Sequence, residues 1–293
     1  MSYYKSIPDR YFKCILYAGR GNKYRENQVL SKLNIDTKIS FNINNTVSGA
    51  MQEANINITG LKVETMSYLS TSFSPWIREP VQNKIELYAG YENRNGLIFS
   101  GNIIDAIPNF DNAEYNIQLK AITAFPVLLN TIKSYSFEGE QDLIYILEQI
   151  NKDLQFTFVK SLNKQYKVYN YCYNNTSIIN HLRNLADITN TNIYIDTERL
   201  IVSELNEPVK QYRKIKLDLT NIVGAIKPNM LGCELDIKMN TTLRTGQEVE
   251  INSLIFPQLN KTTFIIQTIG HIGDTKSNTW ITHLQLLKKE NYE

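Results

Sequence analysis

Apolar and polar residues alternate along most of this chain, which favours extended strands with one buried face. Between Tyr11 and Phe125 the alternation is clear in the segments "YFKCILYA", "ANINITG", "NKIELYAGY", "GLIFSGNIIDAI" and "YNIQLKAITAF". Turn-forming segments, "AGRGN", "FSPW", "ENRNG" and "PNFDN", separate them. About six short strands with such turns predict an antiparallel barrel or sandwich. The segment "VETMSYLS" predicts one short helix among these strands.

The periodicity changes between about Pro126 and Pro208. Two segments there have apolar residues on one helical stripe: Leu143, Ile144, Leu147 and Ile150 in the first, and Ile178, Leu182, Leu185 and Ala186 in the second. Thr176 or Ser177 is expected to cap the second helix. The segment "NIYIDTERLIVSEL" then predicts a hairpin that turns at Asp196–Arg199.

From Tyr212 onward the chain returns to strand patterns, in "RKIKLDLT", "CELDIKM", "QEVEINSLI", "TTFIIQTIGHI" and "TWITHLQLL". We therefore predict an α+β protein that is mainly β. In it, two antiparallel β-barrel domains, residues 1–125 and 212–293, flank a small α/β module of residues 126–211.

Charge and hydropathy exclude several classes of protein. The 31 Lys and Arg balance 29 Asp and Glu, so no basic footprint for nucleic acid is predicted. No apolar run is long enough to span a membrane, and the start of the chain lacks the apolar core of a signal peptide. Cys14, Cys172 and Cys233 are odd in number and far apart, so we expect free thiols made in a reducing cytosol.

Two of the three histidines, His271 and His283, lie in the last predicted hairpin with Asp274 in its turn. If Ile272 faces Thr279, the two histidines lie on opposite faces of the sheet. A slip of one residue would place them on one face, but roughly 13 Å apart at ~3.4 Å per residue, which is too far for a shared metal. We interpret the stretch as a structural hairpin.

No other segment supports a catalytic, cofactor or metal site, and we predict none of these sites and no enzyme activity. His181 lies beside the apolar stripe of the second helix without a second ligand at helical spacing, so we expect it to pack. Arg20, Lys23 and Arg25 lack the strand–loop–helix context of a phosphate site, which favours an exposed loop. Tyr169, Tyr171 and Tyr173 would line one face of a strand. Such a stripe favours sheet packing or a protein contact over base stacking.

Three parts of the chain resemble the baseplate hub proteins of contractile phage tails, the late control protein D-like hub family. The first is the strand–Gly-Tyr–turn–strand element "NKIELYAGYENRNGLIFSGNIIDA" (Asn83–Ala106). The second is the helix and hairpin of Thr176–Val202, and the third is "LRTGQEVEINS" (Leu243–Ser253) followed by the hairpin of Thr268–Leu284. The resemblance covers most of the chain in architecture.

This resemblance implies two tube-like β-barrels beside a small α/β part and a homotrimeric ring without cofactors. Three copies would present six barrels to a six-fold tail tube protein and would dock a three-fold central spike protein on the other side. Other baseplate proteins would be further partners, and the protein would belong to the virion after assembly in the host cytoplasm. Two alternatives remain: a distal tail or tail-tip ring protein of a non-contractile phage, and a polysaccharide-binding or polysaccharide-degrading tail protein.

Overall fold

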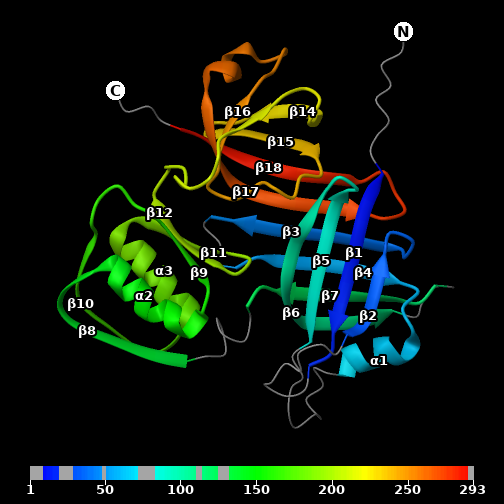
Figure 1. Ribbon diagram of the computed structural model, residues 1–293, viewed down its shortest axis with the longest axis horizontal. Coiled ribbons are helices and arrows are strands. Elements are labelled where there is room, and N and C mark those ends of the chain that lie inside the picture. Colours follow the sequence, from blue (N-terminus) through cyan, green and yellow to red (C-terminus); the bar gives the residue numbers. More distant parts are fainter. Residues whose placement is uncertain are drawn as a thin grey trace.

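Antiparallel strands dominate the computed structural model, as the alternation predicts (Figure 1). It describes residues 9–19, 29–47, 51–71, 83–109, 114–124 and 132–289. The first β unit contains β1 (Arg10–Tyr17), β2 (Val29–Asn34), β3 (Ile39–Thr46), β4 (Glu53–Thr59), α1 (Val63–Thr71), β5 (Lys84–Tyr91), β6 (Arg94–Asn109) and β7 (Asn116–Ile122). The short helix predicted from "VETMSYLS" is α1, and it packs against β6.

The second β unit contains β13 (Ile215–Leu217), β14 (Ile222–Pro228), β15 (Gly232–Lys238), β16 (Glu248–Ile251), the 3-10 turn η2 (Pro257–Lys261), β17 (Thr263–Asp274) and β18 (Trp280–Lys288). It has its own apolar core, in which the side chains of Phe264, Ile266 and Leu284 are buried.

Among the described residues, 13 strands form one continuous sheet through both β units, and eight of them, which we call the eight-stranded sheet, follow the order β14-β15-β18-β17-β3-β4-β7-β6. Figure 1 shows most of them stacked from top to bottom. Every neighbouring pair in this path is antiparallel. The two units meet where β17 pairs with β3, with His271 opposite Ile43. In the described residues the hydrogen-bonded path stays open, ending at β14 and, beyond β5 and β1, at β2.

Strand β6 belongs to two layers of the first unit. Its first half pairs with β5 and its second half with β7, and Asn102 is paired with both neighbours. The strand changes layers at Gly101, where a Cβ atom would lie 2.6 Å from Phe99 Cζ and 2.7 Å from the carbonyl oxygen of Ile122. Only glycine lets the two layers approach this closely.

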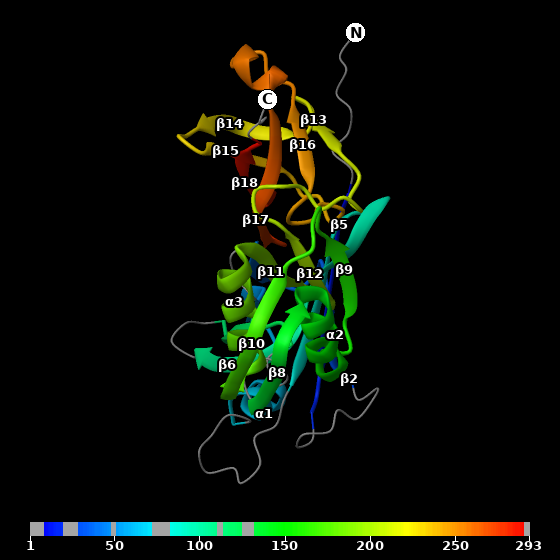
Figure 2. The same cartoon turned by 90° about the vertical axis from the view of Figure 1, so that its left-hand side faces the viewer.

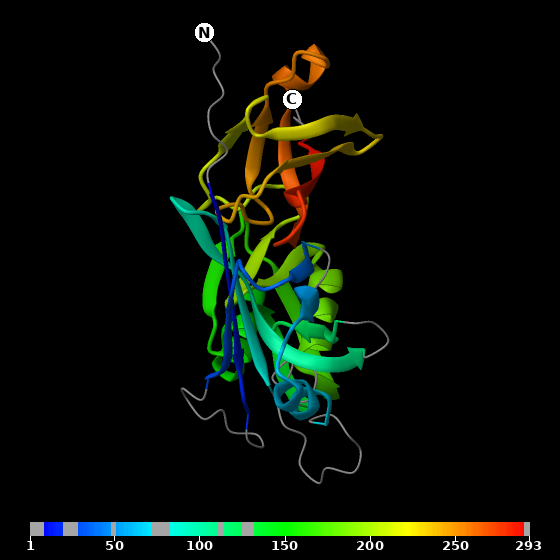
Figure 3. The same ribbon diagram turned by 90° about the vertical axis from the view of Figure 1, so that its right-hand side faces the viewer.

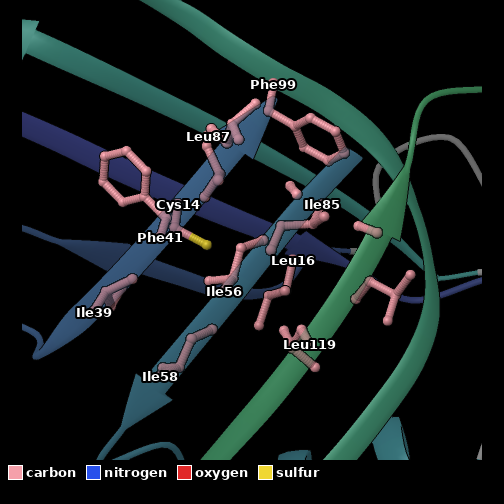
Figure 4. Packing of buried hydrophobic residues seen from close by; sticks show 14 of the residues in the cluster. Cys14, Leu16, Ile39, Phe41, Ile56, Ile58, Ile85, Leu87, Phe99 and Leu119 are labelled. Atoms are coloured by element: carbon pink, nitrogen blue, oxygen red, sulfur yellow. The ribbon is translucent and has the colours of Figure 1, made fainter. Parts of the chain in front are cut away.

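The two layers enclose the first core (Figure 4). Buried side chains from β1, β3, β4, β5, β6 and β7 meet there: Cys14, Leu16, Ile39, Phe41, Ile56, Ile58, Ile85, Leu87, Phe99 and Leu119. Trp280 comes from β18 of the second unit but packs in this core, with its ring centroid 5.5 Å from that of Phe41. Its Nε1–H donates to the carbonyl oxygen of Gly90 at 3.0 Å. The second unit therefore contributes to the core of the first.

The α/β module lies beside the sheet (Figures 1 and 2). It contains β8 (Ile132–Asp142), α2 (Leu143–Leu154), β9 (Thr157–Ser161), β10 (Lys167–Ser177), α3 (Ile178–Thr189), β11 (Thr191–Asp196) and β12 (Arg199–Glu204). Strands β8 and β10 form one sheet, and β11, β12 and β9 form another. Both predicted helices are confirmed, and so is the hairpin, which turns with Asp196 opposite Arg199.

The described residues contain no helix that is long and apolar enough to cross a membrane. All three cysteines are free, with Cys14 and Cys233 buried and Cys172 exposed. The boundaries of the predicted domains, at residues 125/126 and 211/212, stay a prediction. The structure adds that the β units share a sheet.

Candidate assembly surfaces

The last hairpin has neither of the two registers considered from the sequence. Ile272 faces Ile281 and not Thr279, which is a shift of two residues. The turn is tighter than expected because the Asp274 carboxylate accepts hydrogen bonds from the N–H groups of Lys276 and Ser277, at 2.7 and 3.2 Å. This brings Asp274 and Thr279 into the ladder, with Asp274 N–H donating to the Thr279 carbonyl at 2.9 Å.

His271 and His283 still lie on opposite faces of the sheet, because His283 is paired with Gly270, the neighbour of His271. His271 is buried, and its Nδ1 is 3.0 Å from Thr282 Oγ1. Burial, helped by the positive charge of Arg244, lowers its pKa to about 4. His283 Nδ1 lies 2.7 Å from Asp236 Oδ1. The two rings face different environments and cannot share a ligand.

His181 is completely buried among tyrosines of the α/β module. Its Nδ1 is 2.9 Å from the Tyr171 hydroxyl, and its Nε2 is 3.2 Å from the Lys133 carbonyl oxygen. The rings of Tyr135 and Tyr173 lie 4.8 and 5.7 Å from its own. Burial lowers the pKa of this histidine, so the neutral ring packs as predicted.

The predicted tyrosine stripe is wrong for one of its three members. Asn170 has a φ of 48°, and the pairing of β10 with β8 shifts there. This bulge leaves Tyr169 67% exposed while Tyr171 is only 4% exposed. Tyr171 and Tyr173 stack with centroids 6.3 Å apart. Tyr171 and Tyr173 therefore pack around His181, although Tyr173 stays 41% exposed. Tyr169 lies on the surface and donates a hydrogen bond to Glu140 at 2.9 Å.

The α/β module and both β units meet at Asp196, a residue that the sequence indicated only as part of a turn. Its carboxylate accepts a hydrogen bond from Asn45 Nδ2 of β3 at 3.0 Å. Arg244 Nε, from the loop between β15 and β16, lies 3.9 Å away, an ion pair beyond hydrogen-bond length. Nearby, the Tyr194 hydroxyl donates to the carbonyl oxygen of Thr245 at 3.0 Å. Burial raises the pKa of Asp196 despite Arg244. These contacts fix the module against the sheet.

The face of the eight-stranded sheet opposite the first core is rich in amides. We call it the amide-rich face, and in the first unit its side chains are Ser40, Asn42, Asn44, Glu53, Asn55, Asn57, Gln118, Lys120, Asp105 and Ile107. With Ile272, Asp274 and other residues it lines a shallow depression of about 540 Å³. Asparagine is uncommon in strands, so a row of asparagines on neighbouring strands sets this surface apart as a candidate contact surface.

Several large apolar side chains of the second unit are exposed. Met230 and Leu231 lie at the turn between β14 and β15, and Leu254 and Ile255 lie between β16 and η2, each at least 71% exposed. Figure 3 shows these two segments projecting from the end of the molecule that lies far from α1. Exposed side chains of this size are candidates for contacts with partner proteins. Arg20, Lys23 and Arg25 lie outside the described residues.

Solved structures share this fold at low sequence identity. The 43 kDa tail protein of prophage MuSo2 from Shewanella oneidensis is 11% identical, with a TM-score of 0.64 over 94% of this chain and 98% of that one. A tail protein from Neisseria meningitidis MC58 is 9% identical, with a TM-score of 0.63 over 95% and 97% of the two chains. The c3393 protein of E. coli, a type VI secretion component described as similar to T4 tail proteins gp27 and gp5, is 11% identical. Its TM-score is 0.61, over 94% of this chain and 77% of that one.

The fold is thus that of phage tail proteins and their relatives in secretion systems. The chain belongs to the baseplate hub gp41 family, whose model matches residues 21–282. It is a baseplate hub or tail protein of a phage or of a type VI secretion-like system, which confirms the resemblance seen in the sequence. No curated protein sequence matches the chain.

Proposed function

We propose that this hub protein forms a homotrimeric ring that joins the six-fold tail tube to the three-fold central spike of a contractile tail, in a structural and non-catalytic role. One observation carries the proposal. The continuous sheet consists of two antiparallel four-strand groups, β14-β15-β18-β17 and β3-β4-β7-β6, joined edge to edge by the pairing of β17 with β3.

In the proposed ring, the two groups would allow three-fold and six-fold symmetry to meet. A trimer contains six such groups, so one end of the ring can present six similar surfaces to the six subunits of a tube layer. The same trimer has only three copies of the α/β module and of each loop, which suits a three-fold spike. Closed rings of one chain require heterologous contacts between two different patches, and one protomer with two unlike ends of a sheet supplies them.

The amide-rich face is suited to line the channel of this ring. Across both units it carries the carboxylates of Glu53, Asp105, Asp274, Asp236 and Glu234, against the lysines Lys120, Lys238 and Lys227. A wall with a net negative charge repels the phosphate backbone of DNA, which binds proteins mainly through lysine and arginine. Amides hydrate well, so such a wall would let the genome pass without adhering.

Tail tube, central spike and other baseplate proteins are the partners that this role requires. The protein would be assembled in the host cytoplasm and would remain in the virion. The exposed Met230 and Leu254 segments are candidates for the spike or tube contacts, because large apolar side chains anchor protein interfaces.

The number of copies in an assembled tail tests the proposal. We expect three copies per tail, located between tube and spike, measured by quantitative mass spectrometry and cryo-electron microscopy of purified tails. Six copies would indicate a distal tail ring and would contradict the proposal, as would absence from the tail. Binding of the isolated protein to a panel of glycans, combined with a position at the tail periphery, would favour a polysaccharide-binding protein instead.

A further inference from the structure

The contact between Asp196 and Asn45 leaves two buried oxygen atoms without a hydrogen bond. It lies where the hairpin of β11 and β12 meets the end of β3 (Figure 1). Asn45 Nδ2 donates to Asp196 Oδ1 at 3.0 Å, and both residues are at most 5% exposed. Within the described part of the chain, no group donates to Asn45 Oδ1 or to Asp196 Oδ2. Buried acceptors that stay unpaired cost free energy, so this contact lacks a donor.

Arg244 does not supply the missing donor. Its Nε lies 3.9 Å from Asp196 Oδ2, which is beyond hydrogen-bond length. Its Nη1 already donates to the carbonyl oxygens of Thr241 and Leu243, at 3.0 and 2.7 Å. These bonds hold the guanidinium group against its own loop. Its positive charge acts on the carboxylate from a distance, but the second oxygen stays unpaired.

The other titratable neighbours of Asp196 come from the α/β module and the segment that follows it. Arg199 lies opposite Asp196 in the hairpin, and its positive charge favours the ionised carboxylate, as does that of Arg244. Tyr194 and Tyr212 keep their protons, because burial raises the pKa of both. Burial outweighs the two arginines and raises the pKa of the Asp196 carboxyl above its ordinary value. The folded protein therefore holds a proton on this carboxyl at a higher pH than the unfolded chain does.

We propose that Asp196 binds a proton in the folded protein and then pairs with Asn45 through two hydrogen bonds, so that acid strengthens the attachment of the α/β module to the sheet. Asn45 Nδ2 keeps its bond to Asp196 Oδ1, and the new Oδ2–H of Asp196 donates to Asn45 Oδ1. A carboxyl and a carboxamide are both planar, so one coplanar pair satisfies both oxygens that otherwise lack a donor. This attachment belongs to the single protomer and does not depend on how many copies form a ring.

The sign of the pH dependence follows from the raised pKa. A carboxyl of this kind contributes stability that is complete below its unfolded value of 3.8 and is lost as the pH rises through the folded value. The module is thus held more firmly in mild acid than in alkali. His271 acts in the opposite sense, because its pKa is lowered to about 4. The comparisons below are therefore made between proteins that all keep His271.

Asp196→Asn tests the pairing, because its amide has the size of the carboxyl and always offers a donor to Asn45 Oδ1. At pH 8 we expect the equilibrium constant for urea unfolding to be at least about fivefold smaller than in the wild type, which leaves a buried acceptor unpaired there. The gap should narrow as the pH falls to 4.5, because the wild type then gains its proton. A variant that is no more stable than the wild type at pH 8, as expected for an ionised carboxylate held by the arginines, would overturn the proposal. So would a gap that stays constant with pH.

Two further variants give the matched controls. Asp187→Asn, at an exposed position of α3 in the same module, should leave the unfolding constant unchanged at both pH values. In the Asn45→Ala background, Asp196→Asn should bring no gain at pH 8, because the amide then has no partner on β3. A gain that survives without Asn45 would show that the proton of Asp196 does not serve this pair.

Protonation can also be measured on the wild type, whose folding depends on no substitution. Carboxyl carbons of aspartate labelled with carbon-13 shift in the NMR spectrum when the proton leaves. We expect one such resonance to be still titrating above pH 5 and to be absent from Asp196→Asn. A wild-type protein in which every aspartate carboxyl is fully ionised at pH 5 would contradict the proposal, and a carboxylate bridged to Asn45 by a water molecule would give that result.

Discussion

At the scale of single residues, the three histidines share one property: each has a partner inside the fold and none is part of a cluster that includes another histidine. His271 bonds Thr282, His283 bonds Asp236 and His181 bonds Tyr171. The described residues hold no group of three or more His, Cys, Asp or Glu that could bind a metal. The expectation that no residue is catalytic stays a prediction, because nothing in the fold tests it. What the geometry does support is a contribution of His271 to stability that depends on pH.

His271→Gln should make the protein less sensitive to mild acid. The folded state holds the pKa of His271 at about 4, below the ordinary 6.5. Between these values the unfolded chain binds a proton that the folded chain excludes, so stability present above pH 6.5 is lost as the pH falls toward 4. The loss is on the order of 3 kcal/mol. Urea unfolding at pH 7 and pH 4.5 measures it. The control variant His283→Gln, changed on the opposite face of the sheet, should lose as much stability between pH 7 and pH 4.5 as the wild type. If His271→Gln also loses as much as the wild type, the pH dependence does not come from His271.

At the scale of elements, the helices show which local signals act as expected. Asp142 caps α2, and its carboxylate accepts from the N–H of Ile144 at 2.8 Å. Ser177 occupies the cap position of α3 but makes no side-chain hydrogen bond to it. The prediction that Thr176 or Ser177 caps α3 was therefore right for the position and wrong for the bond.

Asp142→Ala should consequently destabilise the protein by about 1 kcal/mol, and Ser177→Ala by only a few tenths. Only the first change removes a hydrogen bond to an N–H group at the start of a helix. Chemical denaturation of the two variants beside the wild type provides the comparison. Equal effects would show that the Asp142 cap does not stabilise α2 in solution.

Strand prediction succeeded where alternation was combined with aliphatic residues. Strands β4, β5, β7 and β15 were predicted, but β2, β3, β8, β9 and β14 were not. In β3 the polar positions are Ser40, Asn42 and Asn44, residues that on propensity alone favour turns. In β14 Gly224 has a φ of 75°, and the pairing shifts after Val223. Pairing with neighbouring strands overrides propensity in β3, and a local bulge interrupts the pattern in β14. No local pattern reveals which distant strand will be the neighbour.

At the scale of the whole molecule, the sheet makes one body of the two β units. The pairing of β17 with β3 joins residues more than 200 positions apart, and Trp280 from β18 lies in the first core beside Phe12 and Phe41. The α/β module keeps a core of its own and is attached through Asp196. The two β units are therefore held together both by a shared sheet and by a shared core.

Trp280→Ala should therefore weaken both β units together. The change removes a buried indole and its hydrogen bond to Gly90, at a cost of about 3–5 kcal/mol, although Trp280 belongs by sequence to the second unit. We expect faster hydrogen exchange in β1 and β5 as well as in β17 and β18, measured by mass spectrometry of peptic peptides, with α2 and α3 changed least. Tyr145→Ala, at a half-exposed position of α2, is the control and should leave the β units protected. If exchange rises only in β17 and β18, the two units are separate folding bodies, because a shared core cannot open on one side alone.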